Sequence, residues 1–175
     1  IQKGVQYDPV RNFTPIGLIG TASMFFLVNP AVKAETARDF VGLAKADPEK
    51  ITIASGGIGS ATHLTAELFQ ARTGIKLVHV PFRGAGPAMN DLVAGHVQSG
   101  FTTLATAASV FDRVRALAIA IETRLATHAS IPTFKEGGID LVVEHWWGVL
   151  APAGLPPEIA ARLTRDLKVI LDSPE

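Results

Sequence analysis

A glycine-rich stretch is the first place in this chain where the residue types suggest chemistry. Three glycines fall within four positions of the segment ASGGIGSATHL, residues 54–64, after an apolar run and before a helical pattern. Glycine lacks a Cβ atom and tolerates positive φ, so the backbone N–H groups of such a turn can converge. The start of the following helix adds partial positive charge. The segment therefore predicts an anion cradle that needs no lysine.

Nucleotide-binding and nucleophile turns fit this stretch poorly. A P-loop needs Gly-Lys followed by Ser or Thr, and no lysine lies between Lys50 and Lys76. A dinucleotide fingerprint needs a third glycine where Thr62 stands, and an acid about 20 residues further on, where residues 76–82 contain none. The Gly-x-Ser-x-Gly motif of a nucleophile elbow is absent. A tight strand-to-helix turn without a ligand is the alternative interpretation of the glycines.

A second turn repeats the arrangement. The segment HVPFRGAGPAM, residues 79–89, again passes from strand to glycine turn to helix, and it adds Phe82 and Arg83. Because ligands bind where parallel strands end at one edge of a sheet, the two turns can lie side by side there. Arg83 could hold a carboxylate through two hydrogen bonds, or it could be an exposed loop residue. Thr102 and Thr103 follow the next expected strand and would present hydroxyls at the same edge.

The histidines and carboxylates do not form a catalytic or metal-binding pattern. The five histidines show no spacing of the His-Glu-x-x-His type, so we predict no metal site. No carboxylates are spaced as an acid–base pair. His63 lies in the first turn of an expected helix and could face the mouth of the cradle, whereas His79 is expected to be half-buried packing. We therefore expect binding rather than catalysis, with no catalytic residue and no cofactor.

Composition excludes several classes of protein. The 175 residues include 16 Lys plus Arg and 16 Asp plus Glu, so no basic field is present to recruit nucleic acid or anionic lipid. The absence of cysteine excludes disulfides, thiolate metal sites and cysteine nucleophiles. No apolar run reaches about 18 residues, so we expect no insertion into a membrane. The first residues contain neither an initiator Met nor a signal peptide, and we expect a piece of a longer chain.

Strands and helices are expected to alternate. Helical periodicity, caps and stops predict helices over residues 37–45, 61–73, 87–94, 105–110 and 157–171, and a helical turn over 132–136. Apolar runs predict strands over residues 16–19, 24–28, 51–54, 76–80, 97–101 and 115–121, and within 139–150. This order implies an α/β fold with a mostly parallel, doubly wound sheet that is covered on both faces.

Two helices carry apolar stripes that need partners. The helix predicted over 61–73 is expected to use Leu64, Leu68 and Ala71 as its apolar face. The last helix has an apolar stripe with no strand after it: Ile159, Leu163, Leu167 and Ile170. That stripe requires a surface on which to dock, either on this sheet or on another part of the protein.

Segments spread along the whole chain resemble one protein family. They are YDPVRNFTPIGLI, FLVNP, ITIASGGIGSATHLTAELF, VHVPFRGAGPAMNDLVAGHV, RALAIA, IPTFKEGG and WWGVLAPAGLPPEI. In order and spacing the chain is similar to the Bug-type solute receptors of tripartite tricarboxylate transporters, which have a periplasmic binding protein type II-like fold. The resemblance implies that residues 28–142 form a complete second lobe. Residues 1–27 and 143–175 would be hinge-crossing segments and a partial first lobe.

The resemblance also carries ligand contacts onto the two turns. The expected ligand-binding residues are Ser55, Gly56, Gly57, Ile58, Gly59, Ser60, Thr62, His63, Phe82, Arg83 and Gly84, with Thr102 and Thr103 at the next strand end. The family commonly has Tyr-Lys-Gly where this chain has Phe82-Arg83-Gly84, and Asp-Asn where it has Thr102-Thr103. Loss of an acid at that strand end argues against an amino-acid ligand.

The expected function is that of a periplasmic receptor. It would capture a small organic carboxylate in an interlobe cleft and deliver it to the permease subunits of a tripartite tricarboxylate transporter. We expect a monomer whose signal peptide lies outside this segment. Two alternatives stay open at this point: an α/β enzyme that uses His63 or His145 as a general base, and the effector-sensing domain of a transcription regulator.

Overall fold

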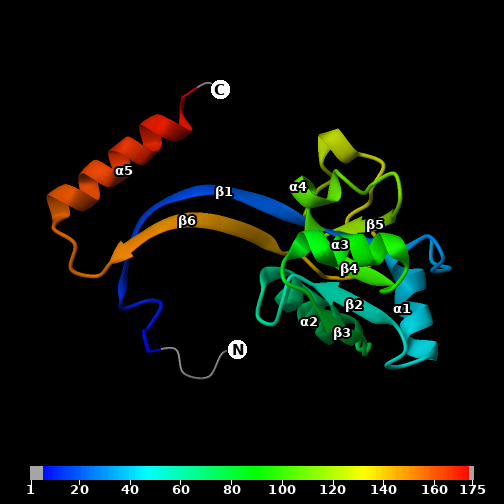
Figure 1. Cartoon of the computed structure of the whole chain (residues 1–175). Helices are drawn as coiled ribbons and strands as arrows, with labels where there is room; N and C mark the ends of the chain where they lie inside the picture. The colour runs from blue at the N-terminus through cyan, green and yellow to red at the C-terminus, as the bar shows by residue number, and fades with distance from the viewer. Residues whose placement is uncertain (1–5, 174–175) are drawn as a thin grey trace. The chain divides into compact units, whose positions relative to one another are not determined.

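The computed structural model of the chain describes residues 6–173, which divide into two compact units (Figure 1). Unit 2 comprises Ala22–His145, and unit 1 combines the described residues before and after that range. The chain passes between the units twice, once within strand β1 (Phe13–Val28) and once within strand β6 (Glu144–Pro152). Strands β1 and β6 pair with each other.

The sheet of unit 2 is mixed, with four strands in one direction. The strands lie in the order β3 (Val78–Pro81), β2 (Thr52–Ser55), β4 (Ser99–Thr103), β1 and β5 (Arg115–Ile119). Strand β2 is parallel to β3 and β4, whereas β1 is antiparallel to its neighbours β4 and β5. Strands β2 to β5 therefore share one direction, which confirms the predicted mostly parallel α/β sheet.

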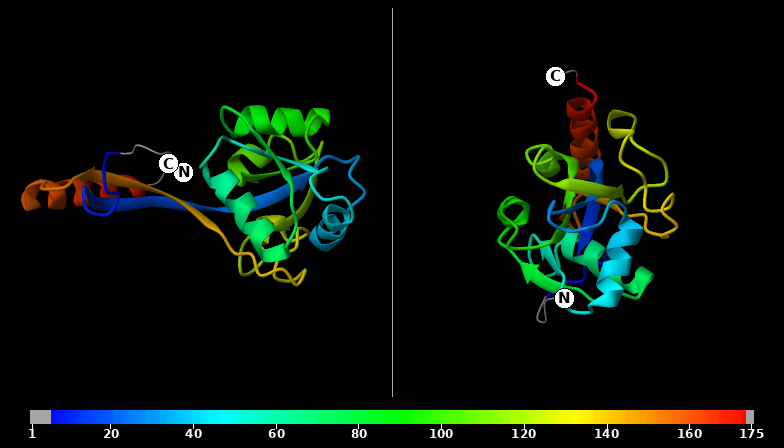
Figure 2. Two further views of the ribbon diagram at one scale, coloured as in Figure 1. Left: turned by 90° about the horizontal axis from the view of Figure 1, so that it is seen from below. Right: turned by 90° about the vertical axis from the view of Figure 1, so that its right-hand side faces the viewer.

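Helices cover both faces of this sheet (Figure 2). One core lies under α1 (Ala37–Ala46) and α2 (Ala61–Thr73), and the other lies under α3 (Ala85–Ala94) and the short α4 (Leu104–Ala107). Successive residues of a strand point to opposite faces, so Phe26 belongs to the first core and its neighbour Phe25 to the second. The ring centroid of Phe26 lies 4.9 Å from those of Phe40 and Phe101.

Local signals fixed α1 and α2 as predicted. The Thr36 side chain and Asp39 form a capping box at the start of α1. Helix α2 has the predicted range 61–73, because Ser60 caps its first turn and Gly74 ends it in the left-handed conformation at φ +68°.

Several predicted boundaries are wrong. The expected strands over 16–19 and 24–28 form one continuous strand, β1, in which Gly20 does not adopt a positive φ. Helix α3 begins at Ala85 rather than Pro87, because Gly84 with φ +114° precedes it. The helical turn expected over 132–136 lies slightly later, over residues 134–138, where Gly137 N donates to Thr133 O at 3.3 Å, and a 3-10 helix, Ala126–His128, precedes it. The last expected strand begins later, at Glu144.

Helix α2 buries a different face from the predicted one. Leu64 is 48% exposed and Leu68 is 36% exposed, whereas Phe69 is fully buried. Thr65 is also buried. Its hydroxyl donates to the carbonyl of Ala61 at 2.8 Å, so burying it leaves no polar group without a hydrogen bond in the core. The spacing of the leucines therefore predicted the wrong buried face for this helix.

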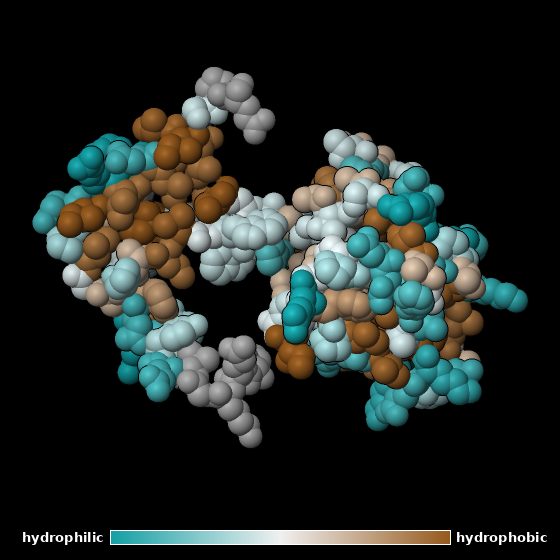
Figure 3. Space-filling model, viewed as in Figure 1, coloured by the Kyte–Doolittle hydropathy of each residue, from teal (hydrophilic) through white to brown (hydrophobic). Residues whose placement is uncertain are grey.

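Only part of the apolar stripe of helix α5 (Pro157–Leu171) packs against the rest of unit 1. Within unit 1 the Thr164 hydroxyl donates to the carbonyl of Ile16 at 2.9 Å, and a Cβ atom at Gly17 would lie 2.8 Å from the Leu167 side chain. Val169 and Ile170 remain 66% and 67% exposed, and apolar side chains spread over this helix in Figure 3. Within the described residues, none of the helices combines the length and hydropathy that a transmembrane span requires.

Candidate functional site

The two glycine turns lie directly against each other in unit 2. Phe82 N donates to Ser55 O at 2.9 Å, and Gly84 N donates to Gly56 O at 3.2 Å. A Cβ atom at Gly56 would lie 3.3 Å from the carbonyl carbon of Gly84 and 3.4 Å from Ala85 N. A side chain at position 56 would thus press on the backbone of the second turn, and the expected side-by-side placement of the turns is present.

The first turn needs glycine conformations as well as space. Gly57 has φ +126° and Gly59 has φ +78°, which side chains other than glycine rarely allow. Ser60 N donates to Gly57 O at 3.1 Å, which closes the turn just before α2 begins. The turn therefore brings the chain from β2 into α2 within five residues, 56–60.

The hydroxyls expected to meet a ligand are engaged in building this turn. Ser55 is buried, and its Oγ accepts from Gly57 N at 3.1 Å and lies 2.6 Å from His79 Nε2. Thr62 Oγ1 accepts from Gly56 N at 2.9 Å and lies 3.0 Å from Ser60 Oγ. These side chains hold the backbone donors in place, a role that depends on how the loop closes and has no signature in residue spacing.

The first backbone N–H groups of α2 and α3 have no hydrogen-bond acceptor within the part of the chain that the structure describes. Among the described residues, no hydrogen-bond acceptor engages the backbone N–H of Ala61 or Thr62 at the start of α2, or of Ala85 or Gly86 at the start of α3. The Ile58 N–H in the turn is free in the same sense. Free N–H groups at helix N-termini, together with the helix dipoles, favour an anion.

The second turn supplies a cation and an aromatic ring. Arg83 is exposed, and no described carboxylate lies within 4.0 Å of its guanidinium. Phe82 is half-buried and packs against the core under α3. Arg83 is thus able to bind a carboxylate, while Phe82 anchors the turn to the sheet.

Thr102 and Thr103 lie at the same sheet edge, beyond the turns' own strands. The sequence placed both threonines after the strand, but they are the last two residues of β4, where they pair with Phe25 and Met24 of β1, beyond the pairing of Gly100 with Ala54 of β2. Thr102 is fully buried, and its Oγ1 has no hydrogen-bond partner among the described residues. Thr103 is half-buried and precedes α4 without a side-chain cap.

Two histidines that no spacing rule connects are stacked beside the first turn. The ring centroids of His63 and His79 are 4.0 Å apart and the rings are inclined by 18°. His63 Nδ1 accepts from Gly59 N at 3.0 Å. Burial lowers the pKa of His79, and the neighbouring His63 lowers it further, while Glu67 acts in the opposite direction. His79 is half-buried as predicted, but the sequence did not indicate its contact with Ser55.

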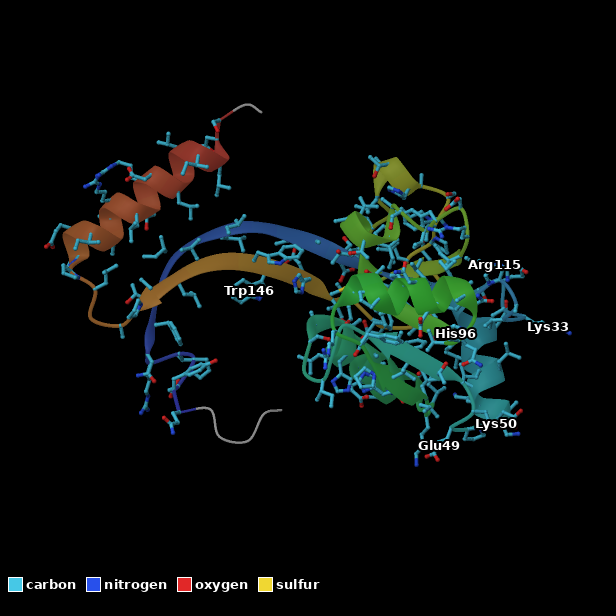
Figure 4. All side chains as sticks on the ribbon, viewed as in Figure 1. Lys33, Glu49, Lys50, His96, Arg115 and Trp146 are labelled. Atoms are coloured by element: carbon cyan, nitrogen blue, oxygen red, sulfur yellow. The ribbon has the colours of Figure 1, made fainter. Side chains whose placement is uncertain are left out.

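A groove of about 540 Å³ lies at the other edge of the sheet. Asn29, Ile51 and Gln98 line it, at the start of β2 and β4 and the end of β1. The basic side chains in this part of unit 2 include Lys33 and Lys50 (Figure 4). The glycine turns do not contribute to this groove, so it is separate from the predicted ligand site.

Comparison with known proteins decides the family. The family model described as the tripartite tricarboxylate transporter family receptor matches residues 1–175. This chain belongs to that receptor family. The resemblance that the sequence segments indicated is therefore confirmed, and membership of a family of solute receptors favours the receptor alternative over an enzyme or a regulator.

Relatives of this receptor family agree in sequence and in structure. BugT of Bordetella pertussis is 30% identical over 176 residues, covering 99% of this chain and 54% of BugT. Rpa4515 of R. palustris, solved with adipate, has a TM-score of 0.89 at 27% identity over 99% of this chain and 59% of its own. MatC of Rhodopseudomonas palustris, solved with malate, has a TM-score of 0.90 at 26% identity, covering 98% of this chain and 59% of its own. The chain spans about half the length of the curated relatives it matches.

Proposed function

We propose that this chain is part of a periplasmic solute receptor that captures a small organic carboxylate and delivers it to the permease subunits of a tripartite tricarboxylate transporter. The observation that carries this proposal is the pair of glycine turns. They touch through the backbone, and each leads into a helix whose first N–H groups are free. The carboxylates bound by two family members, adipate and malate, support the ligand class.

In this proposal the backbone does most of the binding. The free N–H groups of Ile58, Ala61 and Thr62, together with those that open α3, would hold the carboxylate oxygens. Arg83 would add a charge-assisted contact. Ser55 and Thr62 would act through the turn they stabilise, since their hydroxyls are already engaged.

Thr102 and Thr103 would line the end of the site at β4. A buried hydroxyl without a partner is costly, so Thr102 is a good candidate to accept or donate a bond to a ligand group or an ordered water. A hydroxyl at this position cannot neutralise an ammonium group as an acid would. We therefore expect carboxylates without an amino group to bind better than amino acids.

The domain assignment is part of the same proposal. Residues 28–142, which lie inside unit 2, would be the second lobe, and β1 and β6 would be the segments that cross to the first lobe. Ligand capture would then involve hinge motion at these two strands. The exposed apolar stripe of α5 would be covered by further parts of the first lobe, and the receptor would act as a monomer without catalysing a reaction.

The test is titration of the full-length receptor with a panel of dicarboxylates, tricarboxylates and amino acids, followed by calorimetry and thermal shift. Saturable binding of at least one carboxylate is expected. Gly56→Ala is expected to weaken that binding at least tenfold, because its Cβ atom would press on the backbone of the second turn.

The control substitution is Gly42→Ala in α1, where a Cβ atom meets no atom within 4 Å. This variant should bind like the wild type. Absence of binding to every carboxylate, or equal binding by the Gly56→Ala and Gly42→Ala variants, would refute the proposed site.

A further inference from the structure

The glycine turn is held by two histidine rings rather than by its own backbone alone. His63, on α2, accepts the Gly59 N–H at Nδ1 with a distance of 3.0 Å. His79, on β3, lies 2.6 Å from the Ser55 hydroxyl through Nε2. Since Ser55 Oγ in turn accepts from Gly57 N, the stacked rings reach two of the turn's glycines, one directly and one through Ser55.

The bond to Gly59 requires an uncharged His63. A neutral imidazole carries one N–H and one acceptor nitrogen, and the acceptor here must be Nδ1 because Gly59 N donates to it. A protonated ring carries an N–H on both nitrogens. Protonation would therefore place two donors against each other at 3.0 Å and break the only side-chain hydrogen bond to Gly59 among the described residues.

Protonation of His79 would not break its contact with Ser55. A His79 Nε2–H could donate to Ser55 Oγ, which would then direct its own hydrogen to Gly57 O, 3.2 Å away. The sensitive contact is thus the one between His63 and Gly59.

Two titratable groups, Glu67 and His79, lie next to His63 and influence its protonation. On α2, the carboxylate of Glu67 lies 3.6 Å from His63 Nε2 and is 53% exposed, so solvent screens its attraction for a proton on that ring. On β3, His79 faces His63 through the stacked ring, and two charged rings at 4.0 Å would repel each other. The burial that lowers the pKa of His79 keeps the second ring neutral when the first is charged.

We propose that His63 and His79 are positioning residues that keep the first glycine turn in its anion-binding conformation only while His63 is uncharged, so that carboxylate capture weakens as the pH falls. This inference rests on the proposed function, since it concerns the same turn. Histidine is the side chain that ordinarily changes charge between about pH 5 and pH 8. The receptor would then bind its solute best at neutral or alkaline pH.

The experiment compares wild type and His63→Asn in the full-length receptor, with malate as the probe in calorimetry at about pH 7.5 and about pH 5.5. An asparagine Oδ1 can accept from Gly59 N at the place of Nδ1 but does not titrate. The wild-type affinity for malate is expected to fall severalfold between these two pH values, because a protonated His63 would have to release its proton before the turn could re-form. Any titration of malate itself affects both proteins, so the ratio of affinities at the two pH values is compared, and the ratio for His63→Asn is expected to be much closer to one.

The backbone amide of Gly59 gives a readout that does not depend on any ligand. Its NMR chemical shift is expected to follow one protonation step in the wild type and to lose that step in His63→Asn. His96→Asn, in an exposed histidine paired with Asp91, is the matched control and should keep the wild-type behaviour.

The outcomes separate the two proposals. If malate and every other carboxylate fail to bind at both pH values, the proposed function fails, while the Gly59 amide still tests the switch. If the Gly59 amide does not titrate with His63, or if acidification weakens wild type and His63→Asn equally, the inference is overturned. A wild-type affinity that rises on acidification relative to His63→Asn would also overturn it.

Discussion

At the scale of single residues, the site depends on which hydrogen bonds the side chains already make. Residue types alone suggested that the hydroxyls of Ser55 and Thr62 would contact a ligand. In the structure both hydroxyls accept a backbone N–H of the turn, from Gly57 and Gly56 respectively. The free donors are instead the first N–H groups of the helices. Spacing predicted that the two turns lie side by side, but which groups are left free for the proposed anion depends on loop closure and could not be predicted.

His79 offers a test of stability at this scale. Its pKa is lowered in the folded protein, first by burial and then by His63, so the unfolded chain binds a proton more readily. The contribution of neutral His79 to the free energy of unfolding is fully present above the ordinary histidine pKa of about 6.5. It is lost as the pH falls below that value toward the lowered pKa of the folded protein.

His79→Gln, which keeps a donor or acceptor near Ser55 but does not titrate, should therefore flatten this part of the stability curve. The measurement is urea unfolding across about pH 5 to pH 8. A variant that loses as much stability on acidification as the wild type would contradict this role of His79.

At the scale of elements, sequence signals were reliable where they were local. Ser60 and Gly74 set both ends of α2 through a cap and a left-handed residue, so the predicted range was correct. The start of α3 was wrong because Pro87 is also acceptable at the third helical position, where its missing N–H would have had no intrahelical partner anyway. Gly84, with its positive φ, is the N-cap residue that precedes that helix.

Longer-range features were harder to predict from the sequence. Small residues around Gly20 suggested a break in β1, but pairing with other strands determines whether such a segment stays extended. The buried side of α2 was missed because Thr65 satisfies its hydroxyl within the helix, while Leu64 faces solvent. Both errors concern tertiary packing, which periodicity does not contain.

The cap of α2 gives a prediction about an element. Ser60→Ala removes the acceptor for His63 N and the partner of Thr62 Oγ1, and should lower the free energy of unfolding by about 1 kcal/mol. It should also weaken binding of malate, since the helix N-terminus at the proposed site loses its anchor. Denaturant unfolding and calorimetry measure the two effects.

Thr36→Ala is the matched control for this cap. It removes a comparable cap from α1, which lies outside the proposed site, and should cost about 1 kcal/mol of stability without changing the affinity for malate. Equal affinities for the Ser60 and Thr36 variants would show that the α2 cap has no part in binding.

At the scale of the whole molecule, the proposed lobe assignment explains why the apolar side chains of α5 are partly exposed in unit 1. Ile170 is 67% exposed on α5, and in the proposal further parts of the first lobe cover it. In the 175-residue chain, Ile170→Glu should change stability by less than about 0.5 kcal/mol, as is typical of surface substitutions.

In the full-length receptor the same substitution would bury a carboxylate in an apolar contact and should lower the unfolding free energy by about 1–3 kcal/mol. Arg165→Glu, in an exposed residue of the same helix, is the control for the charge change. Equal effects of Ile170→Glu in the short and full-length proteins would argue against the lobe assignment.

The strand order of unit 2 also has a consequence for its behaviour at high concentration. An open sheet border can recruit a strand from another copy and start a polymer. Here β3 is only four residues long and ends in Pro81, which lacks an N–H. At the opposite border, Ile119 of β5 bonds to Pro132 and Phe134 and bridges to Thr133. With one border short and the other covered at the end of β5, unit 2 offers little open border for strand-by-strand aggregation.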